Sequence, residues 1–137
     1  MEITVTPAPT PEDIAEVRAG LMAFNAGHIN MAEMKDIGVF ITDAAGKKLG
    51  GLTGSTTGNW LRIDMLWVSE ALRGQGAGTQ LIRAAEEEAR QRGCQYAQVD
   101  TASFQARPFY EKMGYTVRFT LENYPRQHQR IYLTKTL

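Results

Sequence analysis

The chain has 137 residues, 43% apolar and 22% charged, and its 15 basic residues balance 15 acidic ones. This length fits one domain, so we expect residues 1–137 to form a single domain. The neutral charge argues against a nucleic-acid partner. No apolar run approaches the roughly 20 residues that span a bilayer, no leader-like pattern opens the chain, and its one cysteine allows no internal disulfide, so we expect a cytoplasmic protein without a membrane partner.

The first half predicts a strand, a helix and three hairpin strands. Alternation around Ile3 and Val5 predicts the first strand. Thr10 and Pro11 predict a capped helix start, and apolar residues then recur at helical spacing. Residues 25–36 stay open between loops and a short second helix. Strands are predicted over 38–43, through the glycines at 50–54, and over 60–68, with turns at 44–47 and 56–59.

The second half predicts helices alternating with strands. A helix runs from Gly78 to the glycine at 93, with an apolar stripe and two predicted ion pairs, Glu86 with Arg90 and Glu88 with Arg92. We interpret the acidic run 86–88 as solvated charge. A strand at 96–100, a helix at 106–113 and strands at 115–121 and 130–135 follow. The order βα(α)βββαβαββ predicts an α/β fold (α+β in some schemes) built on a mixed sheet.

A glycine-rich turn, residues 73–78, lies between a predicted strand and a predicted helix. Its bare backbone amides and the positive helix end would suit a phosphate or a pyrophosphate. The turn matches neither of two common phosphate-binding motifs. A dinucleotide fingerprint would need glycine where Thr79 stands, and a P-loop would need Gly-Lys-Ser/Thr at the end of the turn, where this chain has Gly-Thr-Gln. A tight connection that binds no ligand remains the alternative.

Two segments together resemble the GNAT superfamily of N-acetyltransferases. Residues 66–78, LWVSEALRGQGAG, resemble its cofactor motif Gln/Arg-x-x-Gly-x-Gly/Ala, and residues 103–115, SFQARPFYEKMGY, resemble its A-x-x-F-Y-x-x-x-G-F/Y helix. The resemblance implies a splayed sheet of six or seven strands with helices on both faces. It also implies transfer of an acetyl group from acetyl-CoA to an amine, with no metal, and allows a homodimer.

The resemblance assigns roles along both motifs. The turn would bind the pyrophosphate of coenzyme A, the strand before it would bind the pantetheine arm and polarise the acyl carbonyl, and the phenol of Tyr110 would protonate the departing thiolate. Ser103 stands where many relatives carry asparagine. The cofactor-binding candidates are Leu66, Trp67, Val68, Arg73, Gly74, Gln75, Gly76, Ala77, Gly78, Thr79 and Ser103.

The base and the acceptor site are less well defined by sequence. Asp64 is a candidate base on the strand before the turn, and the alternative is a structural partner of Arg62. By resemblance, the segments after the first helix and between the last two strands line the acceptor site, which makes Phe24, His28, Tyr124 and His128 candidates. The rival functions are a phosphate- or nucleotide-using enzyme and a coenzyme A sensor without catalytic activity.

Overall fold

The structure, a computed structural model, describes residues 1–137 and divides them into two compact units, residues 1–33 and residues 34–137. The first unit holds helix α1 (Pro11–Asn25) and the 3₁₀ turn η1 (Met31–Glu33). The predicted cap is confirmed: the Thr10 hydroxyl accepts the Asp13 N–H, and the Asp13 carboxylate accepts the Thr10 N–H, both at 3.0 Å.

The predicted strand at Ile3–Val5 is wrong, because residues 1–10 form no strand and both side chains are exposed. Alternation alone does not make a strand, since a strand needs a neighbour to receive its backbone hydrogen bonds. No helix of the chain is both long enough and apolar enough to cross a membrane. The prediction of one domain over residues 1–137 stays a prediction.

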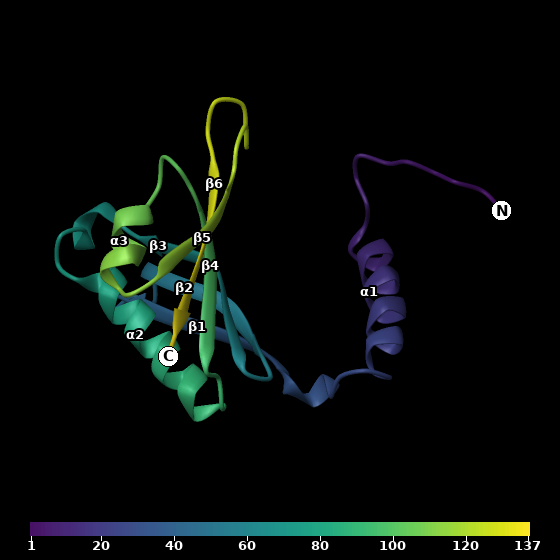
Figure 1. Ribbon diagram of the computed structural model, residues 1–137, viewed down its shortest axis with the longest axis horizontal. Coiled ribbons are helices and arrows are strands. Elements are labelled where there is room, and N and C mark those ends of the chain that lie inside the picture. The colour runs from purple at the N-terminus through teal and green to yellow at the C-terminus, as the bar shows by residue number, and fades with distance from the viewer. The chain divides into compact units, whose positions relative to one another are not determined.

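The second unit is a six-stranded open sheet, as expected for a mixed α+β fold (Figure 1). The strands follow the order β1-β2-β3-β4-β6-β5. All neighbours are antiparallel except β3 and β4, which are parallel. Their bounds are β1 (Met34–Thr42), β2 (Lys48–Thr57), β3 (Trp60–Val68), β4 (Tyr96–Ala102), β5 (Thr116–Leu121) and β6 (Arg130–Thr136).

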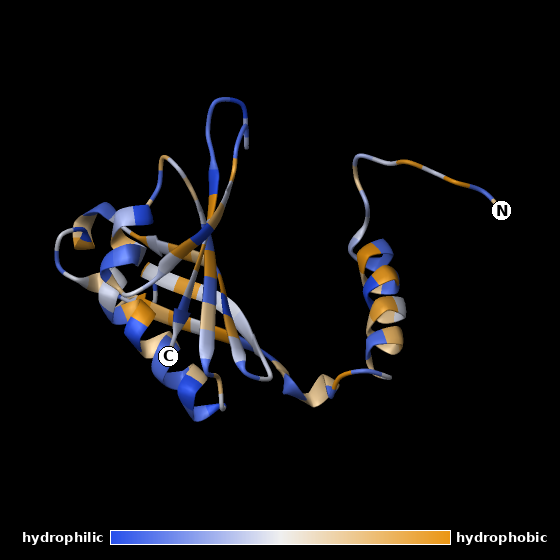
Figure 2. Ribbon diagram, in the orientation of Figure 1, coloured by the Kyte–Doolittle hydropathy of each residue, from blue (hydrophilic) through white to orange (hydrophobic).

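Two helices of this unit cover one face of the sheet (Figure 1). Helix α2 (Ala77–Gln91) follows the turn η2 (Glu70–Leu72) and makes the crossover that joins parallel β3 and β4. Helix α3 (Arg107–Lys112) joins β4 to β5. Apolar and polar residues alternate along α2 (Figure 2), and its predicted apolar stripe is confirmed as buried: Leu81, Ile82, Ala85 and Ala89. Helices on both faces stay a prediction.

The position of Glu86 on α2 corrects the interpretation of the acidic run 86–88 as solvated charge. Glu86 is only 2% exposed, so it is not part of a solvated run. Its carboxylate accepts the Tyr115 O–H at 2.9 Å and lies 3.0 Å from the Lys135 ammonium. Arg90 pairs with Glu87 instead, at 3.6 Å. Helical spacing could not show that β6 supplies a closer cation to the buried face.

The middle of β3 carries a bulge that changes which side chains face α2. Opposite the Thr53–Gly54 step of β2, Asp64 is an extra residue between the paired positions Ile63 and Met65. Gly54 is required here, because a Cβ at this position would lie 2.0 Å from the Arg62 carbonyl oxygen. The bulge separates an N-terminal half of β3 that fills the core from a C-terminal half that lines cavities.

Candidate active site

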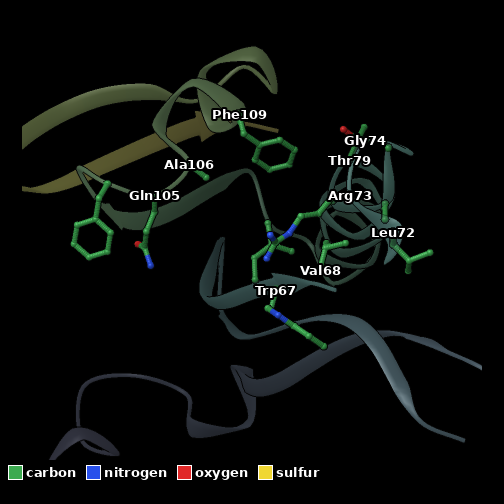
Figure 3. Close-up of a pocket in the computed structure, with 14 residues that line it drawn as sticks. Trp67, Val68, Leu72, Arg73, Gly74, Thr79, Gln105, Ala106 and Phe109 are labelled. Atoms are coloured by element: carbon green, nitrogen blue, oxygen red, sulfur yellow. The ribbon is translucent and has the colours of Figure 1, made fainter. Parts of the chain in front are cut away.

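A cavity of about 710 Å³ lies where β3 ends and α2 begins (Figure 3). Three segments line it: the end of β3, the glycine turn with the start of α2, and the segment from the end of β4 into α3. The lining residues are Leu66, Trp67, Val68, Leu72, Arg73, Gly74, Gly76, Ala77, Gly78, Thr79, Phe104, Gln105, Ala106 and Phe109.

The glycine turn bends in a way that other residues adopt only with strain. Gly74 and Gly76 have φ of 78° and 76°, the left-handed region, and Gly76 is the N-cap of α2. A Cβ at Gly78 would lie 3.3 Å from the Phe109 ring. The first four N–H groups of a 15-residue helix have no partner within the helix and carry its positive end. This wall of the cavity therefore suits a phosphate or pyrophosphate.

Side chains around the turn differ in where they point. The Arg73 guanidinium projects into the cavity (Figure 3), and its contact with Glu70 is loose at 3.8 Å. A cation at this place adds to the attraction for anions. The Gln75 side chain instead donates to the Ala71 carbonyl at 2.9 Å and does not line the cavity.

A second cavity, about 500 Å³, is a slot where β3 and β4 separate. The two strands pair only from Trp60 with Tyr96 to Ile63 with Val99, which accounts for the gap beyond. The slot shares four lining residues with the larger cavity, Leu66, Trp67, Gln105 and Ala106, so the two cavities adjoin. A long, thin ligand bound in the larger cavity can therefore reach into the sheet.

Tyr110 lines this slot from α3 and is only 5% exposed. Burial and, after it, the negative charge of Asp100 raise the pKa of the Tyr110 phenol to about 12. Its ring packs edge-to-face against Phe109 and Tyr115, at 5.2 and 5.9 Å between centroids. Tyr110 is therefore a protonated donor at neutral pH, held in one orientation beside the slot.

The slot also carries two carboxylates, each paired with an arginine. Asp64 lies 3.1 Å from Arg62, the structural partnership that the sequence left open, and it remains 48% exposed. Asp100 lies 3.4 Å from Arg130, which lines the slot as well. Both acids can face a bound ligand while their charge is partly balanced.

The remaining sequence candidates lie in loops, except Phe24, which lies at the end of α1. Ser103 bonds to the β5–β6 connection, its hydroxyl accepting the Gln129 N–H at 3.0 Å, and it lines neither cavity. His128 packs edge-on against Phe104, a cavity residue, at 4.8 Å. Tyr124 lies under the Arg130 guanidinium at 5.6 Å. Phe24 and His28 contact each other in residues 1–33, with ring centroids 5.4 Å apart.

Several lining residues were not among the sequence candidates. Phe104, Gln105, Ala106 and Phe109 bring the start of α3 to the cavity, and Asp100 with Arg130 brings β4 and β6 to the slot. The first four belong to the motif that contains Tyr110, so proximity in sequence was a usable signal. For Asp100 and Arg130 no local signal existed, because their meeting depends on the pairing of β4 with β6.

Comparison with known proteins gives consistent results. Residues 9–115 match the model of the acetyltransferase (GNAT) family. The chain is 39% identical over 100 residues to the acetyltransferase Atu2258 of Agrobacterium fabrum, covering 73% of each chain. It is 40% identical over 97 residues to the blasticidin-S acetyltransferase of Streptomyces morookaense, covering 68% of this chain and 71% of that one. A crystal structure of an acetyltransferase from Bacillus cereus is similar with a TM-score of 0.83 and 29% identity, covering 100% and 98% of the two chains.

Proposed function

Because the chain belongs to the acetyltransferase (GNAT) family, and is therefore an acyltransferase that uses acetyl-CoA, we propose that it transfers the acetyl group directly to a primary amine. No covalent enzyme intermediate is involved. The observation that carries this proposal is the adjoining cavity and slot, which place an anion-binding turn and a buried phenol along one path. The path suits a long ligand with phosphates at one end and a reactive thioester at the other.

The lining of the larger cavity fits coenzyme A. We assign the pyrophosphate to the amides of residues 73–78, with the Arg73 charge beside them and the Thr79 hydroxyl at the cavity wall. The apolar side chains of Leu66 and Val68 line the course of the pantetheine arm. Beyond Ile63, β3 no longer pairs with β4, so its backbone N–H and C=O groups on that side are free. The pantetheine arm can bind to these groups as an added strand would. Acetyl-CoA supplies the thioester that the amine attacks.

We assign Tyr110 as the general acid. Its phenol stays protonated because its pKa is raised to about 12, and it lines the slot where the departing sulfur would lie. A thiol has a reference pKa near 8.5, so a thiolate leaving in water is tolerable, but a donated proton lowers the barrier further as charge develops. Such a donor contributes a factor of about 10² or more in rate.

The acceptor must lose a proton before it attacks. At pH 7 an amine with a pKa near 10.4 requires about 4.6 kcal/mol to become neutral, so a base beside it matters. We assign this role to Asp64, directly or through water, because its exposed carboxylate lines the slot while Arg62 holds it in place. Asp100 has less access because burial by β6 and Arg130 confines it.

For the acceptor we propose a polar small molecule that carries a primary amine, as in the blasticidin-S acetyltransferase relative. We propose that Tyr124 and His128 contact it, and Phe24 and His28 remain acceptor-site candidates from the sequence. The contact of Tyr124 with Arg130, which lines the slot, supports a place for the β5–β6 connection at the acceptor end. A homodimer stays a prediction, to be tested by light scattering on the purified protein.

The function is tested in two steps. Calorimetry should detect binding of coenzyme A, and a thiol-release assay with acetyl-CoA should show turnover with at least one member of an amine panel that begins with blasticidin S. Binding without turnover on a broad panel of amines, peptides and polyamines would favour a sensor over an enzyme. A properly folded protein that does not bind coenzyme A would refute the proposal.

The two assigned side chains are tested by substitution in the same assay. Tyr110→Phe should lower kcat by about 10² at neutral pH and leave the binding of coenzyme A unchanged, whereas Tyr96→Phe, which packs on Trp60 away from the slot, should be silent. Asp64→Asn should lower kcat/KM at pH 7 and lose less near pH 10, where the amine is already neutral. A Tyr110→Phe enzyme with full kcat would remove the assigned acid.

A further inference from the structure

A short turn at the end of β4 lies where the two cavities adjoin. Its last residue, Gln105, lines both the larger cavity and the slot. Its neighbour Phe104 lines only the larger cavity, and Thr101 lines only the slot. The Gln105 side chain is therefore placed where an elongated ligand would pass from one cavity into the other.

The chain fixes which way the Gln105 carboxamide faces. Its Oε1 accepts the Ala102 N–H at 2.8 Å and the hydroxyl of buried Thr101 at 3.2 Å, and the Gln105 N–H donates back to the Ala102 carbonyl at 2.9 Å. A backbone N–H can bond only to the oxygen of a carboxamide, so exchanging oxygen and nitrogen would break this arrangement. The oxygen is committed to the turn.

The nitrogen of the same group faces the other way. The Nε2 of Gln105 meets no acceptor of the chain, and Figure 3 shows it directed into the cavity on the side opposite Phe109. Two N–H donors in a fixed orientation at this point select for a ligand acceptor. A protonated amine could not use them, because both groups only donate, whereas an amide carbonyl could.

We propose that Gln105 is a cofactor-binding residue whose Nε2 donates a hydrogen bond to an amide carbonyl of the pantetheine arm as the arm enters the slot. This inference rests on the placement of coenzyme A proposed above. The glycine turn then holds the phosphates, and Gln105 holds the arm at the opposite end of the cavity. Ser103, the position that family resemblance favours, bonds to Gln129 and leaves this task to Gln105.

Two substitutions separate binding from a purely structural role. Gln105→Glu keeps an oxygen that accepts from Ala102 and Thr101, so the turn survives, but it has no donor for the ligand. Gln105→Met keeps the length of the side chain and removes both functions. If Gln105 only fastened the turn, the Glu variant would behave as the unsubstituted protein and only the Met variant would be impaired.

The measurement is calorimetric titration with two ligands. One is coenzyme A, and the other is adenosine 3′-phosphate 5′-diphosphate, which has the phosphates but no arm. Both variants should bind coenzyme A about tenfold more weakly, the loss of one hydrogen bond, and the nucleotide as well as the unsubstituted protein does. In turnover, the KM for acetyl-CoA should rise while kcat changes little.

Three outcomes would overturn the inference. They are a Glu variant with unchanged affinity for coenzyme A, equal losses for both ligands, and a Glu variant whose melting temperature falls in parallel with its affinity. The unsubstituted protein distinguishes this failure from that of the proposed function. If the unsubstituted protein binds coenzyme A while the variants give one of these three outcomes, only the role of Gln105 is refuted.

Discussion

Glu86 provides the sharpest test of how α2 is fixed to the sheet. Replacing Glu86 by alanine removes the acceptor of the Tyr115 hydroxyl and the counter-ion of Lys135. Removing one partner of a buried ion pair typically costs about 3–5 kcal/mol, because the other charge stays buried. The Lys135 side chain is 19% exposed and can partly reach water, so we expect the lower end, about 3 kcal/mol.

The measurement is unfolding by urea and by heat, followed by circular dichroism. For a chain of this length, 1 kcal/mol corresponds to roughly 3–4 °C, so the melting temperature of Glu86→Ala should fall by about 10 °C. Glu87→Ala is the matched control on the next residue of the helix. Its side chain is 61% exposed and pairs with Arg90 at 3.6 Å, so its change should stay within about 0.5 kcal/mol.

A double variant identifies the cause of the loss. Glu86→Leu combined with Lys135→Met removes both charges and fills the site with apolar atoms, so it should recover part of the stability that Glu86→Ala loses. The reasoning is refuted if Glu86→Ala and Glu87→Ala are equally stable. It is refuted also if the double variant is no better than the single one, because the loss would then come from packing and not from the unpaired ammonium.

The remaining predictions concern the glycine turn and the buried phenols. Gly76→Ala should weaken the binding of coenzyme A at least tenfold by calorimetry, because alanine adopts the φ of 76° found at this position only with strain. Gly46→Ala is the control: Gly46 has a φ of 86° in the β1–β2 turn and open space around it, so this variant should carry similar strain and leave binding unchanged. Burial and then the Glu86 charge raise the pKa of Tyr115, and burial raises that of Tyr110. The stability that these two protonated phenols contribute is present below the pKa of an unfolded tyrosine, near 10, and is lost as the pH rises above it. The free energy of unfolding should therefore fall from about pH 9 upward, and it should fall less in Tyr115→Phe. An unchanged slope in that variant would contradict the assignment.

Local chemistry in the sequence determined most of the elements in residues 34–137. Gly93 and Gly114 end α2 and α3 in the left-handed conformation, and Gly46 and Gly58 close hairpins, as their positions predict. The bend at 73–78 could likewise be predicted, because its closely spaced glycines come directly before the apolar stripe of a helix, and glycine adopts a φ near 76° without strain. The family followed from two motifs in the right order, and the comparisons confirm it.

The tertiary structure alone decided which residues meet across the sheet. The ion pair of Glu86 with Lys135 joins residues 49 positions apart, and the pairing of β4 with β6 brings Arg130 to Asp100. The slot exists because β3 leaves β4 after Ile63, and Gln105 faces it because its oxygen is held by Ala102. Local propensities set turns and helix ends within a few residues, whereas strand register and burial depend on distant segments, and these fix the charges and donors of the site.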